Sequence, residues 1–302
     1  MNLREFWVAT KIQLSRNGVS ENIIESELLI RCSMRINKEE FYASLSDPIS
    51  ALQKYQTDLL IQRRLCGEPL AYILGHREFY GLDFFVNSNV LIPRQETELL
   101  VETILSLNRS ISPDNLTIAD IGTGSGAIAI ALAHQLPKAT IFATDLSTKA
   151  LEVADINRHK HGVAERVHLL HGNLLEPLKT PVDIIVSNLP YLKTSELTEA
   201  AEEIKREPPE ALDGGTDGLK IINSLLKKAP SYLRDLGHIL IEISPEQLKK
   251  VIQICRTNFQ SSKISSIKDI QNLHRIVHVE TIKSQGNLDV NTGFDFEHSQ
   301  SG

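Results

Sequence analysis

Residues 182–191 constrain the fold of this chain more than any other stretch. Val182 begins a run of mostly apolar, β-branched residues, which is typical of a strand covered on both faces in a parallel sheet. Pro190 has no backbone N–H to donate, so the strand ladder ends before it. Asn188 is therefore predicted at the carboxyl edge of the sheet, where open α/β sheets bind ligands. A simple turn is the alternative, because Asn and Pro are ordinary turn residues.

Strand and helix patterns alternate from residue 116 to residue 280. The predicted strands are residues 116–121, 140–144, 167–170, 182–187, 238–243, 263–269 and 274–280. Only residues 270–273 separate the last two strands, which is too short for a crossover helix, so we expect an antiparallel final pair. The pattern predicts an α/β fold with a doubly wound, mostly parallel seven-stranded sheet and a reversed end strand.

A glycine-rich turn follows the first of these strands. Gly122 and Gly124 permit a tight turn and the close approach of a ligand, and the helix predicted at 127–136 presents unpaired N–H groups at its start. Asp145 ends the second strand, where a carboxylate can accept both hydroxyls of a ribose. Together these features predict a nucleoside-binding site.

The glycine turn leaves the identity of the nucleoside open. Gly122, Gly124 and Ala127 also satisfy the pattern of dinucleotide-binding turns, so NAD is an alternative ligand. A purely structural turn is a third interpretation, which Asp145 at the expected strand end disfavours. Glycine spacing alone does not separate these ligands.

The first part of the chain has a helical pattern. Between residues 3 and 74, apolar residues recur at three- and four-residue spacing, which predicts a bundle of about four helices. The segment Ser46-Asp47-Pro48 is the predicted start of one of these helices. The bundle is expected to precede the sheet as a separate region.

Residues 75–94 connect the two regions. Aromatic residues on both sides of Gly81 predict a β-hairpin, and three of the nine Phe residues of the chain fall here, so we expect it to pack as a connector. Residues 93–98 then open a helix, with Glu96 and Glu98 in its first turns, where the helix dipole favours carboxylates. A wall of the active site is an alternative role for this segment.

Composition limits the partners and the compartment. The 302 residues carry a net charge of −6, with a pI near 5.9, so the overall charge of the chain does not attract it to nucleic-acid phosphates. No stretch approaches the roughly 20 apolar residues of a membrane span. Cys32, Cys66 and Cys255 are widely spaced and predict buried thiols in a reducing cytosol. These features predict a cytoplasmic protein. The histidines between residues 159 and 171 lack metal-ligand spacing, so we expect no metal site.

The residues after the fourth strand distinguish between the candidate ligands. Together with the glycine turn and Asp145, the sequence Asn188-Leu189-Pro190-Tyr191 resembles class I (Rossmann-like) S-adenosylmethionine-dependent methyltransferases that modify planar amino or amide nitrogens. Over nearly its full length the chain resembles the HemK/PrmC family, the peptide chain release factor N5-glutamine methyltransferases. The blocks that carry this resemblance are residues 63–64, 67–72, 78–82, 91–98, 120–129, 207–208, 211–215 and 217–219.

The resemblance implies a set of site residues. The implied cofactor-binding residues are Gly122, Thr123, Gly124, Ser125, Gly126, Asp145, Asn173 and Asn188. The implied substrate-binding residues are Asn188, Leu189, Pro190 and Tyr191, of which Asn188, Leu189 and Tyr191 would be catalytic. Residues 122–126 would cradle the methionine portion of S-adenosylmethionine, Asp145 would hold the ribose, and Asn173 would lie beside the adenine.

Two positions depart from the family pattern, which has Pro where this chain has Gln95 and Leu189. Leu189 frees one φ angle and adds an N–H, at an entropic cost of about 1 kcal/mol, so we expect a less preorganised loop. Its carbonyl is retained. The hypothesis is that Asn188 Oδ1 and the Leu189 carbonyl accept the two N–H bonds of a glutamine amide, while Tyr191 packs on the amide plane.

The resemblance also implies a domain order and a function. Residues 1–74 would recognise the substrate, 75–94 would connect, 95–283 would form the methyltransferase domain, and 284–302 are predicted to be a disordered tail. The implied reaction methylates the glutamine of a Gly-Gly-Gln motif in release factors, with no direct nucleic-acid substrate. The alternatives are a glutamine in a ribosomal protein, an adenine amine in nucleic acid, and a cofactor-binding scaffold weakened by Leu189.

Overall fold

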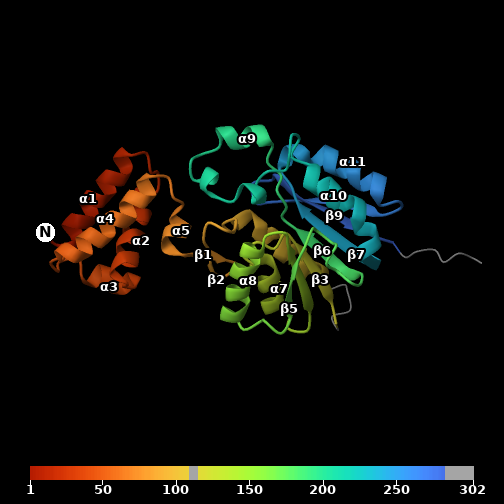
Figure 1. Cartoon of the computed structure of the whole chain (residues 1–302), viewed down its shortest axis with the longest axis horizontal. Coiled ribbons are helices and arrows are strands. Elements are labelled where there is room, and N and C mark those ends of the chain that lie inside the picture. Colours follow the sequence, from red (N-terminus) through yellow and green to blue (C-terminus); the bar gives the residue numbers. More distant parts are fainter. Residues whose placement is uncertain (109–114, 283–302) are drawn as a thin grey trace, which may run out of the picture.

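A helical bundle, a β-hairpin and an α/β domain follow one another along the chain, as the computed structural model shows (Figure 1). The structure describes residues 1–108 and 115–282. The predicted disordered tail at 284–302 lies outside the described residues. Within the described residues, no helix has both the length and the apolar content to cross a membrane.

The bundle is built from amphipathic helices. They are α1 (Leu3–Arg16), α2 (Asn22–Met34), α3 (Lys38–Ala43), α4 (Ala51–Leu65) and the short α5 (Leu70–Leu74). Leu14, Leu29 and Ile61 come from three of these helices and pack in one buried cluster. The predicted helical pattern of this region is therefore confirmed.

The predicted helix start at Ser46-Asp47-Pro48 is wrong. Pro48 instead pairs with Asn2 in an isolated β-bridge, which holds this segment extended in front of α1. The helix α4 begins four residues later than Asp47, where Ser50 Oγ accepts the Gln53 N–H at 3.2 Å and Gln53 Oε1 accepts the Ser50 N–H at 2.9 Å. This reciprocal capping box satisfies two of the free donors at the start of the helix.

The hairpin packs as the sequence predicts. Its strands β1 (His76–Phe79) and β2 (Leu82–Phe85) are antiparallel. Phe79 and Phe84 are fully buried, and their rings meet edge to face at a centroid distance of 6.1 Å. The hairpin is therefore a packed connector rather than a loose linker.

The α/β domain contains one seven-stranded sheet. Its strands are β3 (Thr117–Ile121), β4 (Thr140–Asp145), β5 (Val167–His171), β6 (Val182–Ser187), β7 (Leu233–Glu242), β8 (Lys263–Lys268) and β9 (His274–Glu280). Their order in space is β5-β4-β3-β6-β7-β9-β8. The last strand, β9, is antiparallel to both neighbours, so the predicted antiparallel pair is confirmed. The reversed strand lies between β7 and β8, one place inside the edge of the sheet.

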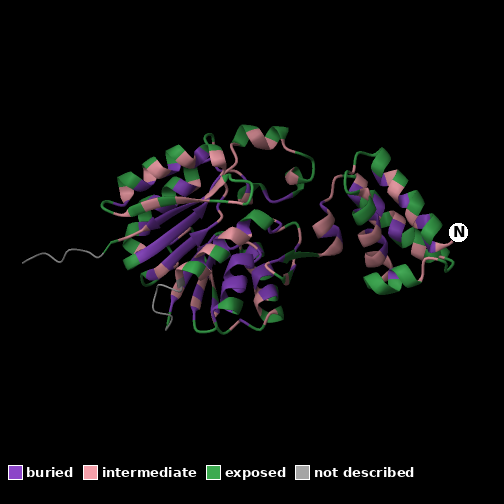
Figure 2. Ribbon diagram, turned by 180° about the vertical axis from the view of Figure 1, so that it is seen from behind, coloured by how far each residue is buried: buried purple, intermediate pink, exposed green. Residues whose placement is uncertain are grey.

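Helices cover both faces of this sheet (Figure 2). The helices of the α/β domain are α6 (Glu98–Asn108), α7 (Ala127–Gln135), α8 (Thr148–Lys160), α9 (Thr194–Glu199), α10 (Lys220–Lys228) and α11 (Leu248–Asn258). Ile184 and Val186 of β6 pack in one cluster with α6 and α7, whereas Val182 and Ile185 pack in another with α10 and α11. The strand β6 is buried on both faces, as predicted, and it is the central strand of the sheet, so Asn188 lies at the middle of the carboxyl edge.

The three cysteines differ in burial. Cys255 on α11 is buried, Cys32 is half-buried, and Cys66 is exposed; all three are free thiols. The expectation of buried thiols is therefore correct for Cys255 and wrong for Cys66. Cys66 is exposed because it lies at the C-cap of α4, in the turn that leads to α5.

Candidate active site

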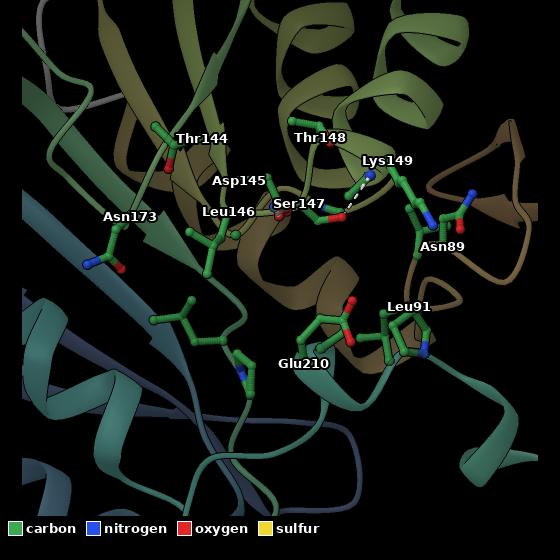
Figure 3. A pocket seen from close by; sticks show the side chains of 18 of the residues that line it. Asn89, Leu91, Thr144, Asp145, Leu146, Ser147, Thr148, Lys149, Asn173 and Glu210 are labelled. Atoms are coloured by element: carbon green, nitrogen blue, oxygen red, sulfur yellow. Dashed lines mark hydrogen bonds between the residues drawn. The ribbon is translucent and has the colours of Figure 1, made fainter.

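A cavity of about 620 Å³ lies at the carboxyl ends of β3, β4, β5 and β6 (Figure 3). It is lined by segments 89–91, 144–150, 171–174 and 188–190, together with Gly122, Gly124, Pro208, Glu210, Ala211 and Ile221. Ligand pockets in proteins have volumes of about 300 to 1,000 Å³. The cavity therefore has the size of a small-molecule site, at the sheet edge that the sequence indicates.

The glycine turn forms one wall of this cavity. Gly122 and Gly124 have φ values of +74° and +56°, which residues with a side chain rarely adopt. The N–H groups of Gly122 and Thr123 both donate to the Thr144 carbonyl at 2.9 Å. A Cβ built on Gly124 would meet no atom within 4 Å, so open space remains on this side of the turn. The turn is fixed to the end of β4 and leaves room for a ligand against its backbone.

Thr123, Ser125 and Gly126 support the turn from beneath. Thr123 and Ser125 are buried, and the Thr123 hydroxyl donates to Asp120 Oδ2 at 2.6 Å. A Cβ on Gly126 would lie 2.9 Å from the side chain of Ile130, so a larger residue would disturb helix α7. These three residues belong to the turn, but they do not line the cavity.

Asp120 is a fully buried carboxyl group near the end of β3, next to the turn. Burial raises the pKa of Asp120 to about 7, against the lowering effect of the hydrogen bond from Thr123. Its Oδ1 atom has no hydrogen-bond partner among the described residues. The Thr123 hydrogen bond therefore links the stability of the turn to this carboxyl group.

Asp145 lies at the end of β4 in the cavity wall. Its Oδ2 accepts the Gly124 N–H and its Oδ1 accepts the Ser147 N–H, both at 2.9 Å. Burial raises the pKa of Asp145, and these backbone N–H groups oppose the shift. Glu210 extends toward this side from the opposite wall (Figure 3). Each carboxylate oxygen of Asp145 keeps a further lone pair, so the group can also accept hydroxyls from a ligand.

Asn173 and Leu174 line the cavity after β5. The exposed Asn173 donates from Nδ2 to Glu176 Oε1 at 3.3 Å. Leu174 adopts φ +54°, and its carbonyl accepts the Thr144 hydroxyl at 2.9 Å. Leu174 adds an apolar residue to the wall. Sequence reasoning chose Asn173 and missed Leu174. A positive φ at a leucine has no signal in the sequence.

Asn188 projects from the end of β6 and is half-buried in the wall. Its Nδ2 donates to Thr97 Oγ1 at 2.9 Å. Thr97 is buried in the 3₁₀ turn η1 (Gln95–Thr97) that precedes α6. Because the amide nitrogen is engaged, Oδ1 is the group that Asn188 offers to a ligand. Thr97 was not singled out from the sequence, although an active-site wall was one interpretation of residues 93–98.

The residues after Asn188 have different environments. Leu189 is buried, and its Cδ2 atom lies 3.0 Å from the Cβ position of Gly122, so its side chain packs closely under the glycine turn. Pro190 lines the cavity. Tyr191 is half-buried outside the lining, and burial together with the charge of Glu242 raises its pKa. The structure thus brings Asn188, Leu189 and Pro190 to the cavity, whereas Tyr191 does not line it.

A buried ion pair fixes the loop that covers one side of the cavity. Glu207 accepts the Ile92 N–H at 3.0 Å and pairs with the Arg94 guanidinium. The Glu207 side chain is only 3% exposed and that of Arg94 is 35% exposed, so the carboxylate is shielded from solvent and the guanidinium is partly exposed. It holds the neighbouring Pro208 and Glu210 against the cavity.

A second ion pair joins this loop to the helical bundle. Arg64 on α4 donates to both carboxylate oxygens of Glu25 on α2. Its Nη2 also donates to Glu203 Oε1 at 2.6 Å, just before the turn η2 (Ile204–Arg206). Figure 1 shows the loop around α9 extending toward the bundle. The bundle and the cavity-covering loop are therefore in direct contact.

Comparison with known proteins gives matches over both parts of the chain. Residues 7–75 match the family model of the PrmC N-terminal domain, and residues 95–268 match that of the methyltransferase small domain. The release factor glutamine methyltransferase of Moorella thermoacetica is 40% identical over 257 residues, which cover 85% of this chain and 90% of that protein. The protein of the same name from Geobacter sulfurreducens is 38% identical over 264 residues, or 84% of this chain and 91% of that protein.

Solved structures support the fold. A methyltransferase from Pyrococcus furiosus aligns with a TM-score of 0.50 at 16% identity, covering 73% of this chain and 97% of that one. At this identity the likeness concerns the fold alone.

Proposed function

Since this chain belongs to the release factor glutamine methyltransferase family, we propose that it methylates the side-chain amide nitrogen of a glutamine in peptide chain release factors. The observation that carries the proposal is the orientation of Asn188. Its amide nitrogen is bound to Thr97, so its oxygen is free to accept an N–H bond from a planar amide at the cavity. The methyl donor is S-adenosylmethionine.

The residues around the cavity fit this donor. The open space above Gly124 admits a ligand against the backbone of residues 122–126, which would hold the methionine portion. Asp145 would accept the ribose hydroxyls with the lone pairs that its backbone partners leave free. Asn173 would lie beside the adenine, with Leu174 as an apolar surface for the ring. When bound, S-adenosylmethionine would supply a methyl group on a positively charged sulfonium, whose sulfur is an excellent leaving group because it departs as a neutral thioether.

The chain's own residues would orient the nucleophile. A glutamine amide is weakly nucleophilic, because its nitrogen lone pair is delocalised into the carbonyl. In the proposed complex, Asn188 Oδ1 and the Leu189 carbonyl accept its two N–H bonds and direct the nitrogen toward the methyl group. Tyr191 packs against the amide plane. Fixed dipoles around the nitrogen stabilise its developing positive charge, and the proton is lost after transfer, so catalysis comes from positioning and preorganised electrostatics.

The proposed division of labour places protein recognition in the N-terminal region. Residues 1–74 would recognise the release factor, 75–94 would connect, and 95–283 would carry out the transfer. The match of residues 7–75 to the PrmC N-terminal domain supports this division, as does the contact of Arg64 with the cavity-covering loop. We propose a cytoplasmic enzyme whose substrate is the Gly-Gly-Gln motif of a protein, not nucleic acid.

A transfer assay with several acceptors tests this proposal. Purified protein and radiolabelled S-adenosylmethionine are incubated separately with release factors, ribosomal proteins and DNA. We expect label only in release factors, and none in a matched release factor whose Gly-Gly-Gln glutamine is replaced by glutamate. Labelling of a ribosomal protein or of DNA in place of release factors would contradict the proposed substrate. Absence of transfer to every acceptor, with normal cofactor binding, would favour a scaffold.

A further inference from the structure

Glu242 is a buried carboxyl group that the proposed reaction has not used. It ends β7, which is paired in parallel with β6 in a register that joins Ser187 to Ile241. Glu242, at the end of β7, and Asn188, just after β6, therefore lie side by side at the carboxyl edge of the sheet. Glu242 is only 3% exposed and does not line the cavity. A carboxyl group in such a place requires hydrogen-bond partners, because burial without them is costly.

Two hydroxyl groups are candidates for these partners. The hydroxyl groups of Thr97 and Tyr191 both lower the pKa of Glu242, so both lie close to its carboxyl group. The same Thr97 hydroxyl accepts the Asn188 amide. Tyr191 follows Asn188 by three positions. Glu242 is therefore near two groups that surround the proposed substrate amide: Thr97, which binds Asn188, and Tyr191. Its Oε2 atom has no partner of good geometry among the described residues.

The Thr97 hydroxyl determines which way Asn188 faces. A hydroxyl has one proton to donate and two lone pairs. If the proton is given to Glu242, Thr97 Oγ1 can only accept from Asn188, so Nδ2 turns inward and Oδ1 faces the cavity. If the proton is not given to Glu242, the hydroxyl can donate to Asn188 Oδ1, and the amide turns over. Asn188 would then present N–H donors to a substrate amide whose own N–H groups need acceptors.

We propose that Glu242 is a positioning residue for methyl transfer: it accepts the Thr97 hydroxyl proton and so keeps Asn188 Oδ1 directed at the substrate amide. This inference rests on the proposed function and deepens it. The same carboxyl group also interacts with the Tyr191 hydroxyl, which lowers the pKa of Glu242. In the proposed complex Glu242 thus acts on both groups that flank the glutamine: on Asn188 through Thr97, and on Tyr191 directly. Glu242 itself does not contact the methyl donor.

The ionisation of Glu242 should make methyl transfer depend on pH. Burial raises the pKa of Glu242 to about 7, and Glu96 acts in the same direction, whereas Arg275, Thr97 and Tyr191 act against it. A protonated Glu242 can donate to Thr97 instead of accepting from it, and Asn188 then loses its orientation. The ionised form is the active one. We therefore expect kcat to rise with pH through the pKa of Glu242.

Three variants test the inference, each assayed for kcat, KM for the release factor and Kd for S-adenosylmethionine. Thr97→Val keeps the shape and removes the hydroxyl, so kcat should fall on the order of 10²-fold, as for other misplaced reacting groups, with Kd unchanged. Thr97→Ser keeps the hydroxyl and should retain activity near that of the wild type. Glu242→Gln should lower kcat and abolish its rise around pH 7. Thr103→Val, at a partly buried threonine of α6, is the matched control and should leave kcat unchanged.

The outcomes separate this inference from the proposed function. No transfer by the wild type to a release factor would contradict both. Transfer by the wild type with equal kcat in Thr97→Val would contradict the inference alone, and so would a Glu242→Gln variant that keeps the pH profile. Melting temperatures and cofactor affinity identify misfolding. If Thr97→Val is unstable, the contrast between the pH profiles of wild type and Glu242→Gln decides.

Discussion

Asn157 on helix α8 pairs with both backbone polar groups of Phe85 in the hairpin. Its Oδ1 accepts the Phe85 N–H at 2.7 Å, and its Nδ2 donates to the Phe85 carbonyl at 3.0 Å. The same Nδ2 donates to the Ser125 carbonyl in the glycine turn at 2.9 Å. One fully buried amide therefore holds the connector and the cofactor turn in a fixed relation.

Replacement of Asn157 tests this relation. Asn157→Ala leaves buried backbone groups of Phe85 and Ser125 without partners, which should lower the free energy of unfolding by about 1–3 kcal/mol. Urea denaturation measures the change. Asn223→Ala, at an exposed position of α10, is the control and should change it by less than about 0.5 kcal/mol. Equal effects of the two substitutions would contradict a structural role for Asn157.

The two partners of Arg64 should contribute unequally to stability. Arg64 and Glu25 have side chains that are 7% and 10% exposed, whereas the Glu203 side chain is 48% exposed. Glu25→Ala leaves the buried Arg64 without its buried counter-ion, which typically costs about 3–5 kcal/mol. Glu203→Ala removes an exposed partner and should cost less than about 1 kcal/mol. Thermal unfolding of both variants measures this, and a larger loss from Glu203→Ala would contradict the assignment.

The histidine pair between β7 and β9 should make stability depend on pH. His238 Nδ1 and His278 Nε2 are 3.0 Å apart and both rings are buried. Burial, with a smaller effect of His238, lowers the pKa of His278 to about 4. The unfolded chain, with an ordinary histidine pKa of about 6.5, takes up the proton first, so stability is present above pH 6.5 and is lost as pH falls toward 4.

Substitution of His278 isolates this contribution from that of other groups. Buried acids such as Asp120, whose pKa is raised, change stability in the opposite direction over part of this range. We therefore compare His278→Gln with the wild type at each pH. The melting temperature of the wild type should fall more steeply than that of the variant between pH 7 and pH 4.5. Parallel curves would show that His278 does not titrate in this range.

The proposed ribose contact can be tested by binding alone. Asp145→Ala removes a carboxylate that would accept ribose hydroxyls, and hydrogen bonds to charged groups contribute about 1.5–3 kcal/mol. The Kd for S-adenosylmethionine should therefore rise by roughly 10- to 100-fold in calorimetric titration. Asp155→Ala, at a partly exposed aspartate that pairs with Arg158, is the matched control. An unchanged Kd in Asp145→Ala would rule out the ribose contact.

The core of the sheet could be predicted from the sequence because buried parallel strands have a simple pattern. The strand at 182–187 has the bounds that its apolar run indicates. The next strand, β7, starts at Leu233 rather than at the predicted residue 238. Its first part is exposed and contains Leu236 at φ +59°, so apolar periodicity begins only after Gly237. The position of β9 inside the edge was also beyond prediction, since strand order depends on long-range packing.

The site could be predicted only where residues follow strand ends. Asp145 and Asn188 come directly after apolar runs, so the topology of a parallel sheet brings them to one edge. Thr97 and Glu242 are ordinary polar residues in the sequence, and Thr97 reaches Asn188 across 91 positions. Contacts between such distant side chains depend on the packing of the whole domain, and a single sequence has no signal for them.

The most direct test of the proposed role of Asn188 is to measure methyl transfer to a release factor by the Asn188→Ala variant. The variant and the wild type are given a release factor, and mass spectrometry locates and quantifies the methyl group, while titration gives the Kd for S-adenosylmethionine. Loss of one preorganised polar group at a reacting centre lowers kcat by about 10²–10³-fold, so we expect no detectable transfer, with a Kd close to that of the wild type. Normal turnover by Asn188→Ala would contradict the claim that this amide presents the glutamine nitrogen to the methyl donor.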